Sequence, residues 1–203
     1  MKTILNIILS IAIVVLGYLL VKSVMKPIEF QKEQEKRYAK TIERLKDIRS
    51  VQDAFKAKYG GYTDSFDTLV KFIKADSILV ERPDGDIPDT LDLKEALKMK
   101  IVKMVATKIA VKDTVFKSKY APDSIGYVPY GEGVMFNLDT ATVEAAKVKV
   151  KVFEASVTNK VLLHGLDEQL INNLDDIKVS LTGFAGLKVG SLKEANNNAG
   201  NWE

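Results

Sequence analysis

The chain has 203 residues, of which 46% are hydrophobic and 28% charged, enough for one packed domain and an appended segment. Its net charge of +3 is accounted for by Lys2, Lys22 and Lys26, so the rest is formally neutral and nucleic acid is not an expected partner. The absence of cysteine excludes disulfides and thiolate metal sites, and the single histidine, His164, excludes histidine triads and ordinary zinc sites.

The first predicted element is an apolar helix over residues 4–21, in the run ILNIILSIAIVVLGYLLV. The run carries no charge and would be roughly 27 Å long as a helix, close to the hydrocarbon thickness of a bilayer. A signal peptide or a buried core helix would share this composition. The run is longer than a usual signal-peptide core, however, and the following VKSVMKP offers no small-x-small cleavage pattern. We therefore predict an uncleaved single-pass membrane anchor over residues 1–26.

Three residues that interrupt the apolar run define a candidate face for a membrane partner: Asn6, Ser10 and Gly17. Ser10 and Gly17 are seven positions apart and fall on nearly one side of a helix, where small residues let another helix approach closely. Asn6 would add an interhelical hydrogen bond. An ordinary lipid-facing helix with isolated small residues explains the pattern equally well. Lysines flank the run on both sides, so charge alone leans only slightly toward a cytoplasmic remainder.

Residues 27–61 predict a long amphipathic helix, which Pro27 kinks rather than ends. Residues up to Arg37 are almost wholly polar and are expected to cross water or lipid headgroups before an apolar stripe meets a core. Gly60 and Gly61 then terminate the helix. The apolar stripe consists of Tyr38, Ile42, Leu45, Ile48, Val51, Phe55 and Tyr59. A second, short helix capped by Thr63, Asp64 or Ser65 is predicted to run through Leu69, Phe72 and Ile73.

An apolar helix that passes into an amphipathic one near a proline, followed by AFKAKYGGYTDSFDTLVKFI, resembles the layout of type IV pilins and type II secretion pseudopilins. In these proteins the long first helix ends in an aromatic residue, Gly-x-Tyr-Pro and a short helix with a leucine. The matching residues are Tyr59, Gly61, Tyr62 and Leu69, with Thr63 in the place of proline; the ending NNNAGNWE is similar to that of some major pseudopilins. The resemblance covers the first third of the chain, and the leader glycine and the mature glutamate are absent. It implies a membrane-rooted helix with a compact head outside the cytoplasm.

Residues 62–193 are predicted to form an α+β head with a small, mostly antiparallel sheet. The clearest strand is AKVKVKVFEASV, with valines on one face and lysines on the other. The lysine row would suit phosphate or acidic lipid but is more typical of a solvated or edge-protecting face. Looser alternation predicts a strand in residues 107–116 and a hairpin turned by YGEG. KVLLHGLDEQLINNL predicts a short strand, a turn and a helix, and DDIKVSLTGFAGLKVGSL another strand and a glycine-rich bend.

The loop RPDGDIPDTLD is crowded with aspartates between Asp84 and Asp92, which raises the possibility of a calcium site. Asp84, Asp86 and Glu95 fall at positions one, three and twelve of an EF-hand-like count. Position five is a proline and position six is Asp89 rather than glycine, so the pattern fails. We expect a solvated acidic turn leading into a helix over residues 91–99.

The predicted organisation is therefore an anchor (1–26), a long amphipathic helix (27–61), an α+β head (62–193) and a polar tail (194–203). The tail is polar except for Trp202, so its composition predicts a flexible segment unless the tryptophan docks it.

No residue pattern predicts catalysis. Pairs such as Asp175–Asp176 are expected by chance among 27 acidic residues, and the glycine segments lack nucleotide-binding motifs. We predict a non-enzymatic protein without cofactor, metal or small-molecule substrate, anchored in a bacterial inner membrane with a periplasmic head. Its expected partners are the membrane and protein subunits, or a second copy, in a secretion or pilus-like envelope machine. The alternative is an accessory subunit of another complex, such as a translocon or transporter; an anchored carboxylate enzyme ranks last.

Overall fold

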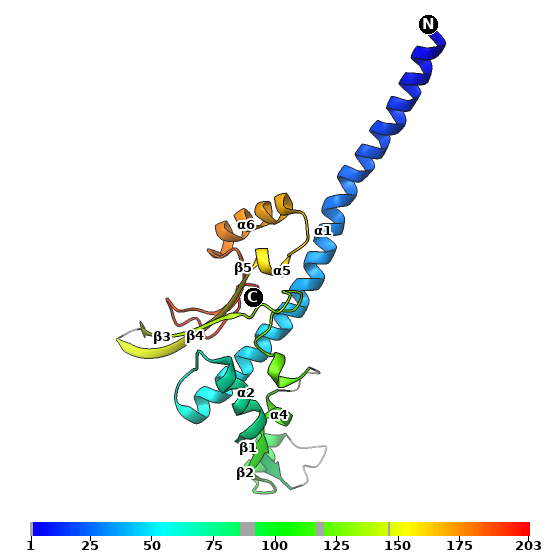
Figure 1. Ribbon diagram of the computed structural model, residues 1–203. Helices are drawn as coiled ribbons and strands as arrows, with labels where there is room; N and C mark the ends of the chain where they lie inside the picture. The colour runs from blue at the N-terminus through cyan, green and yellow to red at the C-terminus, as the bar shows by residue number, and fades with distance from the viewer. Residues whose placement is uncertain (1, 86–91, 117–119, 146) are drawn as a thin grey trace.

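The computed structural model describes residues 2–85, 92–116, 120–145 and 147–203. It has the predicted α+β architecture: one long N-terminal helix and two small antiparallel sheets. Figure 1 shows the helix projecting from the head at its N-terminal end, with the head packed along its C-terminal half and the C-terminus beside it.

Helix α1 spans Lys2–Tyr59 without interruption and includes Pro27. Its second half is rich in Glu, Lys, Arg and Gln, which lose little side-chain freedom in a helix. Lys56 and Lys58 lie in the last turn, where cations stabilise the helix dipole. Gly60 follows with a φ of +76° and donates its N–H to the Lys56 carbonyl, which closes the helix.

Helix α2 (Phe66–Ala75) folds back after α1, and the prediction of a short helix here is confirmed. Ser65 is its N-cap and accepts the N–H of Thr68 at 3.4 Å. The buried side chains of α2 recur at the helical spacing that places them on one face. They are Phe66, Leu69, Phe72 and Ile73.

The distal part of the head is a two-stranded ribbon of β1 (Ser77–Asp84) and β2 (Lys103–Ala110), with α3 (Leu93–Lys98) between them. The predicted strand over 107–116 is wrong beyond Ala110, because Val111–Thr114 form the helical turn α4. This turn lets both Val111 and Phe116 enter the core, which strict alternation would prevent. Of the three residues in the calcium-loop count, Asp84 ends β1 and Glu95 lies in α3, while Asp86 is outside the described residues, as is Asp89.

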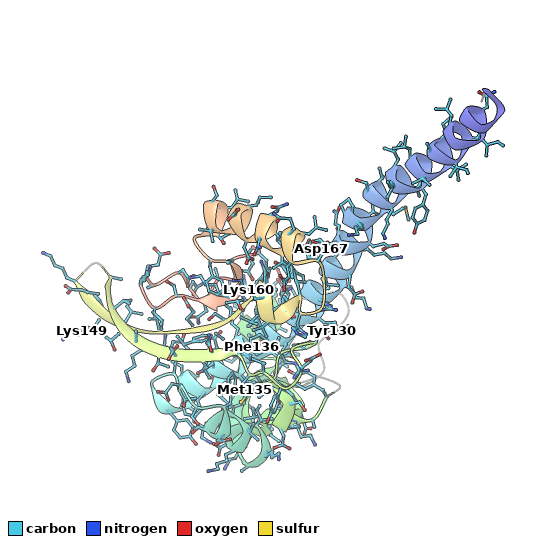
Figure 2. The ribbon with its side chains drawn as sticks, turned by 45° about the horizontal axis from the view of Figure 1, so that its top comes forward. Tyr130, Met135, Phe136, Lys149, Lys160 and Asp167 are labelled. Carbon is cyan, nitrogen blue, oxygen red and sulfur yellow. The ribbon has the colours of Figure 1, made fainter. Side chains whose placement is uncertain are left out.

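The second sheet has the order β3-β4-β5 and consists of β3 (Asn137–Ala145), β4 (Val148–Thr158) and β5 (Gly186–Gly190). The expectation of one buried and one wet face along β4 is only partly right. Val148 is 62% exposed, whereas both Val152 and Phe153 are buried. The reason is that the β3–β4 hairpin projects beyond the core at the end marked by Lys149 in Figure 2. Before β3 come the 3-10 turn Pro122–Ser124 and a turn in which Val128 N–H bonds the Val134 carbonyl.

Two more predictions in the C-terminal third are wrong. The expected strand in KVLL is the helical turn α5 (Asn159–Leu162), and the expected strand in DDIKVSL is the second half of α6 (Glu168–Thr182). Asp167 caps α6, so the helix starts upstream and runs through the alternating segment to Gly183, where φ is +70°. The strand β5 comes instead from the glycine-rich bend. A Cβ at its Gly186 would lie 2.1 Å from the Val157 carbonyl oxygen, so close pairing requires glycine there.

The C-terminal segment is held against the head, so of the two alternatives for the tail the structure has the docked one, not the flexible one. Gly200 forms a bridge with Val189 of β5, and Trp202 packs against the core cluster. Arg49 Nη1 of α1 lies 2.7 Å from the Glu203 carboxylate, which holds the pKa of that carboxyl below its usual range. Composition alone missed the Arg49 contacts because their partners, Asn198 and Glu203, are more than a hundred positions away in the chain.

Candidate functional site: the exposed helix and its junction with the head

From Leu9 to Glu29, α1 is exposed on all sides. Val14 is 72% exposed and Leu20 67%, and none of the most apolar 18-residue window of α1 is buried. Among the described residues, α1 is the one helix long and apolar enough to cross a membrane. A contiguous apolar surface of this size is unfavourable in water, because each large aliphatic side chain is worth about 1.5–3 kcal/mol when moved into an apolar environment.

The three residues of the predicted partner face, Asn6, Ser10 and Gly17, share one side of α1, within roughly 40° of each other about its axis. Ser10 Oγ donates to the Asn6 carbonyl at 3.0 Å, so the hydroxyl is satisfied inside the helix. A Cβ added at Gly17 would meet no atom within 4 Å. The face is therefore open and closely approachable, and the partner itself stays a prediction.

The head begins immediately after the exposed segment. Lys26 Nζ lies 3.7 Å from the Asp167 carboxylate at the start of α6, and Phe30 packs against the core. Arg37 donates from Nη1 to the carbonyls of Leu162 at 3.2 Å and His164 at 2.9 Å. The expectation that α1 crosses water or headgroups as far as Arg37 is thus wrong, because charged side chains at this level of α1 bind the α5–α6 turn.

A buried polar network fixes α1 to α5 and α6. The Tyr38 hydroxyl donates to Asn159 Oδ1, and Asn159 Nδ2 donates to the Asp175 carboxylate at 2.7 Å. Asn159 is fully buried, so each of these bonds satisfies an atom that water does not reach. Burial, with the Asp175 charge adding to it, raises the pKa of Tyr38 to about 12, so the hydroxyl remains a donor throughout the physiological range.

The opposite end of α1 is fixed by a second set of contacts around Gly60. Lys58 Nζ lies 2.8 Å from Asp76 and Tyr59 donates its hydroxyl to the same carboxylate at 2.6 Å. The Lys58 hydrogen bond, followed by that of Tyr59, lowers the pKa of Asp76. Lys151 of β4 donates to the Gly60 carbonyl at 3.0 Å and its side chain lies beside Gly61. The helix end, α2 and the sheet are thereby joined at one point.

The side chains that could act as a catalytic acid, base or nucleophile lie apart from one another. His164 is 64% exposed on its side chain and stands 3.5 Å from Glu132, while Asp175 is engaged with Asn159. No group of three His, Asp or Glu side chains suited to a metal occurs in the part of the chain that the structure describes. Comparisons with models of protein families, with curated proteins and with solved structures found no match.

Proposed function

We propose that this chain is a non-enzymatic, single-pass protein of a bacterial inner membrane, whose periplasmic head is a structural or assembly subunit of a secretion or pilus-like envelope machine. The observation that carries the proposal is the division of one continuous helix. From Leu9 to Ile28 the large apolar side chains of α1 point into open space, and from Leu45 to Val51 they are the centre of the head.

A helix of this kind couples the bilayer mechanically to the head. The anchor and the core share one hydrogen-bonded rod, and Lys26, Phe30 and Arg37 tie the rod to the α5–α6 region directly below the exposed segment. A force or displacement applied to the anchor would therefore move the head as a body. This suits a subunit that positions a head relative to a membrane assembly.

The test of anchoring is fractionation of the full-length protein. It is expected to sediment with membranes and to resist carbonate extraction, whereas a variant lacking residues 1–26 is expected in the soluble fraction. Recovery of the full-length chain, uncut, in the soluble fraction would contradict the proposal. Reporter fusions to the C-terminus, one active only in the periplasm and one only in the cytoplasm, determine which side holds the head.

The test of assembly uses the face formed by Asn6, Ser10 and Gly17. The double variant Ser10→Leu, Gly17→Leu preserves insertion and fills the space that a second helix would occupy. Ala12→Leu, which adds bulk about 140° away around α1, is the matched control. Wild type and the control are expected to co-purify from detergent with a membrane partner or a second copy, and the double variant to lose it. Equal co-purification of all three would contradict a role for this face.

A further inference from the structure

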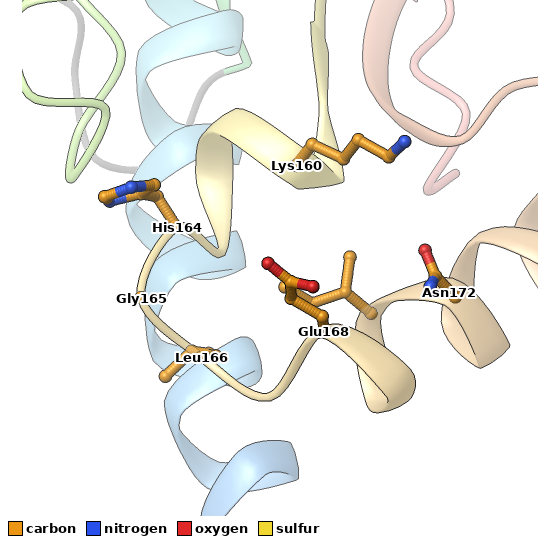
Figure 3. A pocket seen from close by; sticks show the side chains of 7 residues that line it. Lys160, His164, Gly165, Leu166, Glu168 and Asn172 are labelled. Atoms are coloured by element: carbon orange, nitrogen blue, oxygen red, sulfur yellow. The ribbon is translucent and has the colours of Figure 1, made fainter.

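A cavity of about 490 Å³ lies between α5 and α6, on the part of the head next to the exposed half of α1. Figure 3 shows Lys160 and Asn172 approaching the same space from α5 and α6, with the Glu168 carboxylate at its border. His164 is turned away from it, toward Glu132. The lining consists of Lys160, His164, Gly165, Leu166, Glu168, Ile171 and Asn172.

The cavity combines one cation, one anion and an amide over an apolar floor. Ile171 is only 6% exposed and forms this floor, and Leu166 packs on the core beside it. Among the ion pairs of the described residues, none involves Lys160 or Glu168. Two opposite charges therefore face the same space without neutralising each other.

The position of the cavity relative to α1 places it beside the bilayer surface. Asp167, adjacent to the lining residue Glu168, lies 3.7 Å from Lys26. On α1 the apolar surface continues to this level, since Val24 is 60% and Ile28 54% exposed. Lys22 and Lys26 follow the uncharged run, where lysines lie at the level of lipid headgroups. The start of α6 is thus at headgroup depth if α1 spans the membrane.

We propose that this cavity binds the headgroup of a phospholipid that carries a primary amine, the phosphoethanolamine group. Lys160 donates to the phosphate oxygens. Glu168 and the Asn172 side-chain oxygen accept hydrogen bonds from the ammonium group. The apolar floor at Ile171 contacts the two carbons of the ethanolamine, and the glycerol end leaves the cavity toward the bilayer. This inference rests on the proposed function in one respect: the membrane anchor is what brings a lipid to the cavity. The two charges that would bind the headgroup are present whether or not α1 spans a membrane.

The same groups discriminate against the other common headgroups. Choline has no N–H to donate to Glu168, and no Phe, Tyr or Trp is among the lining residues of the described cavity to bind a quaternary ammonium through its π face. Phosphatidylglycerol has no cation to match Glu168, whose carboxylate would repel its negative charge. A zwitterion with a primary amine is the headgroup that satisfies both charges.

The test measures lipid retention by the detergent-solubilised full-length protein in native mass spectrometry, with phosphatidylethanolamine, phosphatidylcholine and phosphatidylglycerol of identical acyl chains. Wild type is expected to retain one phosphatidylethanolamine about tenfold more strongly than either competitor, the factor expected for one charge-assisted hydrogen bond. Lys160→Gln is expected to weaken retention of phosphatidylethanolamine and phosphatidylcholine alike, because both carry the phosphate. Glu168→Gln is expected to abolish the preference between them.

Matched controls are Lys149→Gln and Glu144→Gln. They remove the same charges from the projecting β3–β4 hairpin, where the two residues lie opposite each other in the strand register. Both are expected to retain lipid as wild type does, and melting temperatures check that all variants fold. Equal retention of the three lipids by wild type, or an unchanged preference in Glu168→Gln, would overturn the headgroup site. Soluble glycerophosphoethanolamine that competes as well as the lipid would overturn the lipid as its source. Membrane flotation of the same variants before detergent is added reports the anchor separately.

Discussion

The two halves of α1 have the same backbone conformation and opposite environments. In the first half, Leu16 is 60% and Leu20 67% exposed; in the second, Leu45 and Ile48 are fully buried. The difference follows from where apolar residues fall around the helix. Residues 4–21 are apolar on every side, whereas the second half has one stripe at a spacing of three or four. A helix with one stripe is completed by a protein core on one side, and a helix apolar all round requires apolar surroundings on every side.

The largest effect expected from this contrast comes from the same substitution made in each half. Leu45→Ala should destabilise the head by about 2–5 kcal/mol, because it leaves a cavity in a packed core. Leu16→Ala, on the exposed half, should change the head's unfolding free energy by less than about 0.5 kcal/mol. Denaturant unfolding of the full-length protein in detergent measures both. Similar losses would mean that the two halves do not differ in the way their exposure indicates.

A tyrosine pair sharpens the comparison. Tyr38→Phe removes the donor to Asn159 in the buried network and is expected to cost about 1–3 kcal/mol. Tyr18→Phe, at a position 65% exposed, is expected to leave unfolding unchanged. The pKa of Tyr38 is raised to about 12, above the ordinary value of about 10. Its contribution to stability is therefore complete below pH 10 and is lost as the pH rises toward 12. Wild type and Tyr38→Phe should accordingly converge in stability over that range, and parallel profiles would contradict the assignment.

The end of the buried half depends more on Gly60 than on Gly61. Replacing both glycines with valine should lower the melting temperature, chiefly through Gly60, whose φ of +76° costs a residue with a Cβ about 1–2 kcal/mol. Gly61→Val should cost less, because the added atoms meet only the flexible end of Lys151. Gly60→Asn is the control, since asparagine tolerates this conformation. Equal melting temperatures for the two single valine variants would show that positive φ is not what ends α1.

The smallest expected effect concerns the ion pair at the same helix end. The hydrogen bond from Lys58 lowers the pKa of Asp76, so its contribution is present above the ordinary aspartate value of about 3.9 and is lost as the pH falls below it. Asp76→Asn should therefore reduce the melting temperature slightly at pH 7 and make no difference at a pH well below the ordinary pKa of aspartate. Asp64→Asn, at an exposed aspartate, is the control. A deficit in Asp76→Asn that persists in acid would point to a packing effect instead.

Much of the fold could be predicted where a short-range pattern carries the information. The apolar run, the stripe of α1 and a cap of α2 among Thr63, Asp64 and Ser65 are all local, and each appears in the structure, with Ser65 as the cap. The strand predictions failed where apolar and polar residues alternate inside a helix that a capping residue starts further upstream. Residues 177–181 alternate like a strand, but Asp167 starts α6 ten positions earlier and the helix continues through them.

The proposed sites divide in the same way. Asn6, Ser10 and Gly17 share a face because helical spacing alone places them there. Lys160 and Glu168 could not be predicted as a site, because two common charged residues eight positions apart form no recognisable motif. They line one cavity only because the chain turns between α5 and α6.

The sequence by itself determined that α1 is one helix, where it ends and which half of it does not pack on the head, because helix spacing, caps and the distribution of apolar residues act over a few positions. Only the tertiary structure decided that the head starts at Lys26, that the C-terminal ten residues are held by Arg49 and β5, and that α5 and α6 enclose a charged cavity. These features join segments separated by more than a hundred residues or by a change of chain direction. Their free energy arises from side chains that meet only after the chain has folded, so no local pattern records it.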